Sequence, residues 1–154
     1  MIDAILALAV SLSTPYIPKE KQRLITEDVI HVVSVSEPLF QDTDSKVARE
    51  KTAKLLLVWA WLESAWNARA VGDGGQSIGV LQITRQWLGS STVAEVLADR
   101  RLGLRIGLGI MRQARDKCGS VKSGLGMYAS GKCGHALPIA AHRCKLAGLT
   151  SECR

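Results

Sequence analysis

One carboxylic acid, Glu63, closes a run of apolar residues that extends from Leu55 to Leu62. If this run is helical, Trp59 lies on the same face as Glu63, because residues four apart are neighbours on a helix. A carboxyl group packed against tryptophan loses hydration, which penalises its charged form and predicts a raised pKa. An acid that keeps its proton near neutral pH can protonate a leaving group, as cleavage of a glycosidic bond requires. The plainer alternative is a glutamate that faces water at a helix end.

Asp73 is the only other acidic residue between Glu63 and Glu95, and it stands among the glycines of residues 72–75. A second carboxylate across the cleft activates a water molecule, so that the bond is hydrolysed. Without one, the 6-hydroxyl of the sugar itself attacks and leaves an anhydro product. Asp73 is also a residue type that hydrogen-bonds its own backbone in turns. Both roles for Asp73, and both reactions, therefore stay open.

Two blocks of sequence follow the apolar run in a specific order. Residues 63–70 read Glu-Ser-Ala-Trp-Asn-Ala-Arg-Ala, and residues 77–83 read Ser-Ile-Gly-Val-Leu-Gln-Ile. Together they resemble the signature of the lytic transglycosylase and goose-type lysozyme families, which cleave peptidoglycan. A weaker third block, residues 126–131, is similar to the tyrosine-containing segment of these families. The resemblance covers about residues 45–134.

The resemblance implies that Glu63 acts first as general acid and then as general base on the β-1,4 bond between MurNAc and GlcNAc. It implies no cofactor and no metal ion. The other residues implied to contact the glycan or support the acid are Ser64, Ser77, Gly79, Gln82 and Tyr128. Gln82 would line the glycan groove, Gly79 would let the sugar approach the backbone, and Tyr128 would lie near the acid.

The sequence departs from the family pattern at three positions. Ala68 replaces a frequent proline, Leu81 a methionine, and Ala129 the asparagine that follows the tyrosine. None of these changes removes the acid, but the lost asparagine puts local substrate contacts in doubt.

The elements that must position these residues are mostly helical. Residues 42–45 form a helix N-cap cluster, and the helix after them, over 46–66, becomes apolar on every side, which is typical of a buried helix. Three glycines in residues 72–75 favour tight turns. Further helices are expected over 84–88, from a cap at Ser91, and over 99–117, 123–129 and 137–145. We therefore expect a mainly α, lysozyme-like fold with a buried central helix and a small glycine-rich β-hairpin or loop.

The chain divides into an N-terminal helical extension, residues 1–41, and a catalytic domain, residues 42–154. Residues 20–35 suit a helix, although 29–35 would also suit a strand. The apolar stretch of residues 2–12 lacks the basic start of a signal peptide and favours a short helix packed on the domain.

Charge is spread unevenly along the 154 residues, whose net charge is +6. Residues 1–99 carry a net −3 and residues 100–154 a net +9. A basic half indicates an anionic partner: nucleic acid, an acidic membrane or an acidic wall polymer. No nucleic-acid reading motif is recognisable, whereas peptidoglycan carries carboxylates. No apolar run is long enough to span a bilayer, which takes about 20 residues.

The four cysteines all lie in the last 37 residues. An even number in a short basic chain fits disulfides, and neighbouring pairs, Cys118 with Cys133 and Cys144 with Cys153, are the simplest. Free thiols and a zinc site with the nearby histidines are the alternatives. Three of the four tryptophans, Trp59, Trp61 and Trp66, are expected mostly in the core, with one available to stack on a sugar.

The small size, the lack of a convincing signal peptide and the absence of a wall-anchoring repeat favour a phage-encoded muralytic protein, with a secreted bacterial enzyme as the alternative. Its partners are then glycan strands and other virion proteins, not nucleic acid. Its place of action is the wall, in the periplasm or outside the cell, or the virion. The rival function is a virion structural or wall-binding protein on a lysozyme scaffold with little activity, because a fold does not guarantee its chemistry.

Overall fold

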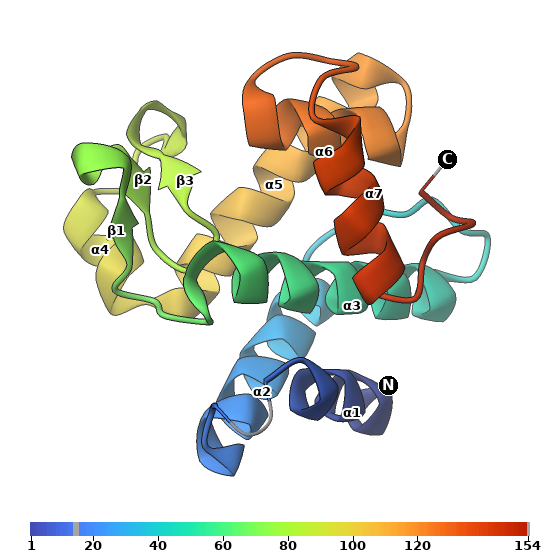
Figure 1. Cartoon of the computed structure of the whole chain (residues 1–154), viewed down its shortest axis with the longest axis horizontal. Coiled ribbons are helices and arrows are strands. Elements are labelled where there is room, and N and C mark those ends of the chain that lie inside the picture. The colour runs from blue at the N-terminus through green and yellow to red at the C-terminus, as the bar shows by residue number, and fades with distance from the viewer. Residues whose placement is uncertain (14–15, 154) are drawn as a thin grey trace.

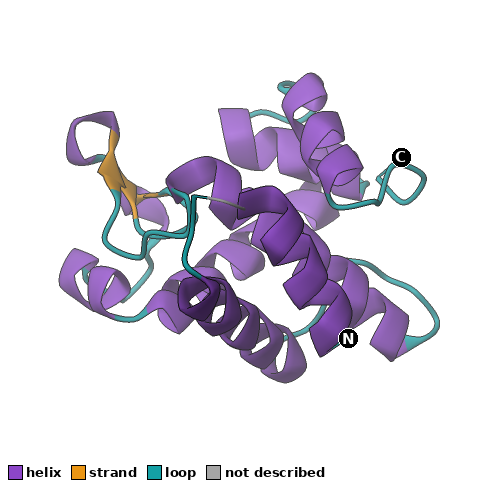
Figure 2. Cartoon of the chain, turned by 60° about the horizontal axis from the view of Figure 1, so that its bottom comes forward, coloured by secondary structure: helices purple, strands orange, loops and turns teal. Residues whose placement is uncertain are grey.

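The computed structural model describes residues 1–13 and 16–153. Within them the protein is mainly helical, with one small antiparallel sheet, so the mainly α prediction is confirmed (Figures 1 and 2). The helices are α1 (Ile2–Ser13), α2 (Lys19–Val35), α3 (Ser45–Ser64), α4 (Val93–Ala98), α5 (Arg100–Cys118), α6 (Val121–Ser130) and α7 (Leu137–Leu146). The strands are β1 (Val71–Gly72), β2 (Ser77–Ile78) and β3 (Ile83–Thr84), and the 3₁₀ turns are η1 (Asp73–Gly75) and η2 (Arg85–Trp87).

Helix α3 is the predicted central helix, and it crosses the middle of the molecule in Figure 1. It begins where expected, because the Asp44 carboxylate caps it by accepting a hydrogen bond from the Lys46 amide at 2.8 Å. Residues 55–60 are all buried. The prediction that burial continues to Leu62 is wrong, since Leu62 is 39% exposed. The helix leaves the core in its last turn, so Glu63 lies at the edge of the core.

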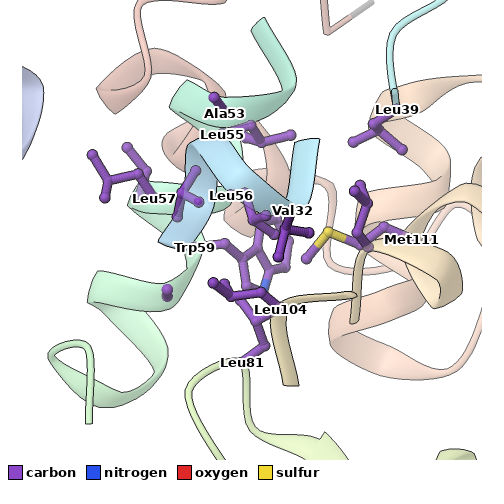
Figure 3. Packing of buried hydrophobic residues seen from close by; sticks show 14 of the residues in the cluster. Val32, Leu39, Ala53, Leu55, Leu56, Leu57, Trp59, Leu81, Leu104 and Met111 are labelled. Carbon is purple, nitrogen blue, oxygen red and sulfur yellow. The ribbon is translucent and has the colours of Figure 1, made fainter. Parts of the chain in front are cut away.

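The core joins the N-terminal helices to the rest of the chain. The predicted N-terminal extension contains α1 and α2, and their buried apolar residues belong to the same cluster as those of α3. Residues 29–35 are therefore helix, not strand. Trp59 is fully buried in this cluster, and Figure 3 shows it among Leu81, Leu104 and Met111. Trp59 thus lies in the core one helical turn before Glu63.

Acidic residues of the N-terminal half neutralise part of the basic half. Asp28 of α2 lies 2.5 Å from Arg100 and 2.6 Å from Arg101 of α5. Glu37 pairs with Arg112 in the same way. Several cations that gave the second half its net +9 are therefore engaged within the fold, and less of that charge remains available to an anionic partner.

The glycine-rich stretch forms the predicted hairpin, and β3 extends it to three strands in the order β1-β2-β3. Ser77 of β2 pairs with Gly72 on one side and with Thr84 on the other. The connection through η1 needs positive φ at three consecutive residues, 73–75, with Gly74 at 62° and Gly75 at 95°. Glycine adopts these angles without steric cost, which explains the local sequence.

The remaining helices confirm the expected positions with two corrections. The residue that caps α4 is Thr92, not Ser91. Thr92 stands three residues before Glu95, the spacing of a capping box. Its hydroxyl accepts from the Glu95 amide at 3.2 Å, and the Glu95 carboxylate accepts from the Thr92 amide at 2.7 Å. The predicted helix over 84–88 is the short 3₁₀ turn η2.

Both disulfides join neighbouring cysteines, as the simplest pairing predicts. Cys118 at the end of α5 is bonded to Cys133 in the loop after α6, and Cys144 of α7 is bonded to Cys153. The free-thiol and zinc alternatives are therefore wrong. The first bond closes a loop around α6, and the second anchors α7.

Replacing Gly124 of α6 by alanine is expected to lower the free energy of unfolding by about 1–3 kcal/mol. A Cβ there would lie 2.4 Å from the backbone nitrogen of Arg115, because α6 crosses α5 at close range. Gly109 of α5 is the matched control, since a Cβ there meets no atom within 4 Å. Gly109→Ala is expected to stabilise the protein by about 0.5–1 kcal/mol. Urea unfolding of both variants checks this, and equal effects would contradict the close crossing.

Candidate functional site

The Glu63 carboxylate lies in the last turn of α3, and its side chain is 23% exposed. Its Oε1 is 2.5 Å from Nη1 of Arg143 on α7. The guanidinium of Arg143 in turn lies 3.9 Å over the Trp59 ring. The prediction of an apolar face next to the acid is therefore incomplete, because a cation covers the tryptophan and binds the carboxylate.

Tyr128 of α6 lies next to Trp59, on which Arg143 also packs. Its ring meets Trp59 edge-on at 5.5 Å, and its hydroxyl donates to the carbonyl of Leu81 at 3.1 Å. Burial raises the pKa of Tyr128 far above its ordinary value, the Glu63 charge raises it further, and Arg143 acts in the opposite direction. The hydroxyl therefore stays neutral, and its proton is donated to the Leu81 carbonyl.

Ser64 fixes the backbone next to the acid. Its hydroxyl lies 2.8 Å from the Val80 carbonyl and accepts from the Asn67 amide at 3.1 Å. The consecutive carbonyls of Val80 and Leu81 thus bond to Ser64 of α3 and Tyr128 of α6. The segment between β2 and β3 is held between these two helices, next to the end of α3.

Gln82 is the last residue of that segment and has a positive φ of 49°. Its Nε2 donates to the Gly79 carbonyl at 2.9 Å, so the side chain folds back over its own turn. Gly79 is itself buried, and a Cβ there would lie 3.1 Å from Cγ1 of Val96 in α4. Close packing against α4 therefore explains the glycine at position 79, and the residue does not open towards a ligand.

Asp73 and Ser77 belong to the hairpin. Asp73 is exposed, and its carboxylate accepts a hydrogen bond from the Ser77 hydroxyl. Asp73 begins η1, which lies at the end of the hairpin remote from the end of α3 (Figure 1). This arrangement is that of a turn residue, as the plainer alternative predicts.

A groove of about 650 Å³ lies beside Tyr128 and Gln82, between the β3–η2 segment and helices α5 and α6. Its other lining residues include Thr84, Gln86, Trp87, Ile110, Gln113, Lys117, Met127 and Ser130. Trp87 is 44% exposed. A partly exposed aromatic ring with amides and hydroxyls around it can cover the apolar face of a sugar and bond its hydroxyls.

The structure brings together some of the sequence-predicted residues and not others. Gln82 and Tyr128 line the groove. Glu63 and Ser64 do not line it; they lie at the end of α3, where the Glu63 charge acts on Tyr128. Sequence reasoning missed Arg143 and Trp87. No sequence feature pointed to Arg143 except its place in the basic half of the chain. Trp87 could have been found as the one tryptophan outside the cluster of residues 59–66.

The described residues contain no group of three or more histidine, cysteine, aspartate or glutamate side chains that could hold a metal ion. They also contain no helix long and apolar enough to cross a membrane. No protein-family model, curated protein or solved structure matches the chain. The chemistry of the site is therefore inferred from its own residues.

Proposed function

We propose that the protein is a peptidoglycan glycosidase that cleaves the β-1,4 bond between MurNAc and GlcNAc, with Glu63 as general acid and then general base. The observation that carries the proposal is a half-buried carboxylate at the end of a buried helix, whose charge acts on Tyr128, a neutral side chain that lines a groove of about 650 Å³. The central helix ending at the acid, next to a small antiparallel sheet, also supports a lysozyme-like fold.

In this mechanism, Glu63 takes up a proton from solvent through its exposed part and passes it to the glycosidic oxygen. The bond to C1 of MurNAc breaks, and positive charge develops on that sugar. An oxygen nucleophile then attacks C1 and returns its proton to the Glu63 carboxylate.

The placement of Asp73 favours the MurNAc 6-hydroxyl as that nucleophile, which gives a 1,6-anhydro product. The Asp73 carboxylate is engaged by Ser77, and η1 lies away from the end of α3 (Figure 1). A water-activating base would have to face Glu63 across the bond. We therefore infer a lytic transglycosylase. If the products were instead those of hydrolysis, Asp73 would again be a candidate for the catalytic base.

The ion pair between Glu63 and Arg143 supports a second candidate function. It engages one of the two carboxylate oxygens, and a wall-binding or virion structural protein could keep such a pair and use the same groove without turnover. Both functions place the protein at the cell wall, in the periplasm or outside the cell, with glycan strands as its partner. In a phage particle, other virion proteins would be further partners.

Purified peptidoglycan carrying a covalent dye distinguishes the two functions. A glycosidase releases soluble dye with time, whereas a binding protein sediments with the insoluble wall and releases none. We expect release, and we expect Asp73→Asn to release dye at the wild-type rate. If the protein neither released dye nor sedimented with the wall, both functions would be contradicted.

A further inference from the structure

We infer that Arg143 is a positioning residue for Glu63, so that the site has a third member contributed by the C-terminal helix. This inference rests on the proposed function. It concerns how the acid is held, and it assigns a task to a residue for which the sequence analysis gave none.

Arg143 is held in place by the Trp59 ring and by the attachment of α7. Its guanidinium stacks on the fully buried Trp59 ring, and its side chain is only 12% exposed. The next residue, Cys144, is buried and bonded to Cys153, which ties α7 to the C-terminal segment. Planar guanidinium groups stack on aromatic faces and bond carboxylates at the same time. Arg143 is therefore a fixed point to which a mobile carboxylate can attach.

Glu63 needs such a point. Ser64 fixes the backbone at the end of α3, but the Glu63 side chain has three further torsions. The C-terminal end of a helix also carries partial negative charge, which disfavours a carboxylate there. Helix α3 has no basic residue of its own in its last turn. The compensating cation comes from α7, at 2.5 Å.

Loss of Arg143 is expected to change kcat and to leave KM nearly unchanged. Arg143 is largely buried and engaged by Trp59 and Glu63, and the aromatic ring and amides proposed to bind the glycan belong to other residues, so we expect its loss to leave KM nearly unchanged. The acid, freed from its partner, spends most of its time away from the scissile bond. A displacement of about 1 Å can cost on the order of 100-fold in rate, so we expect kcat to fall about 10–100-fold.

The test is steady-state kinetics on soluble glycan-strand fragments with Arg143→Met and Arg143→Lys. Methionine keeps an apolar contact with Trp59 but removes the charge, whereas lysine keeps the charge without the planar stack. We expect the methionine variant to show the full loss of kcat at unchanged KM, and the lysine variant to recover most of it. Lys145→Met, an exposed position on the same helix, is the matched control and should behave as wild type.

Thermal melting first shows that each variant is folded, and Arg143→Gln replaces the methionine variant if that one does not fold. A wild-type kcat in the neutral variant would overturn the inference, as would a lysine variant that is no better than the neutral one. Both outcomes leave the proposed function intact if Glu63→Gln is inactive. An inactive wild-type protein would instead overturn the proposed function and this inference together.

Discussion

Replacing Glu63 by glutamine is expected to lower the rate of glycan cleavage by about 10²–10⁴-fold, the usual contribution of a general acid and base. Glutamine has nearly the same size and still accepts a hydrogen bond from Arg143. It can neither give a proton to the glycosidic oxygen nor take one from the attacking hydroxyl. The loss should therefore fall on kcat, and the variant should still bind the groove. Dye release and co-sedimentation with the wall measure the two effects separately.

Two controls make this result specific. Glu20→Gln removes an exposed carboxylate in the first turn of α2 and should leave the rate unchanged. Glu63→Asp keeps the acid but withdraws it by one methylene, so its rate should fall between wild type and Glu63→Gln. A glutamine variant that keeps more than about a tenth of the rate would show that the chemistry lies elsewhere.

Replacing Trp59 by alanine is expected to lower the free energy of unfolding by about 3–5 kcal/mol, the usual cost of truncating a buried tryptophan. That is a large share of the roughly 5–15 kcal/mol that stabilise a typical domain. The side chain is fully buried, packs among Leu81, Leu104 and Met111 (Figure 3), and carries Arg143 on its face. Urea unfolding followed by circular dichroism measures the loss.

Trp87→Ala is the matched control, because Trp87 is 44% exposed at the groove. It should change stability by no more than about 0.5 kcal/mol, as is usual for surface positions. If the two tryptophan variants lost equal stability, the placement of Trp59 in the core would be wrong.

Local features of the sequence were enough to predict the elements around the site. The cap at Asp44 and the apolar run after it define α3, because capping and burial act within the helix itself. The glycines of residues 72–75 define the hairpin turn, because few other residues adopt its backbone angles. The disulfides follow from short separations between neighbouring cysteines. Each of these predictions depends on residues that are close in the chain.

Contacts made by distant segments could not be predicted in this way. Arg143 lies 80 residues from Glu63, and only the docking of α7 on α3 brings the two together. The same holds for Gly79, which packs on Val96 because of where α4 lies. Sequence therefore singled out Glu63 as a candidate, while its charged partner and the shape of the groove depend on tertiary packing.

Mass spectrometry of the soluble products from one digestion of purified peptidoglycan tests the central claim most directly, because it identifies the bond that is broken. We predict fragments that end in 1,6-anhydro-MurNAc with intact stem peptides, and none of them when Glu63→Gln replaces the wild-type protein. Fragments cut within or next to the peptide, with glycan strands left whole, would contradict a glycosidase centred on Glu63.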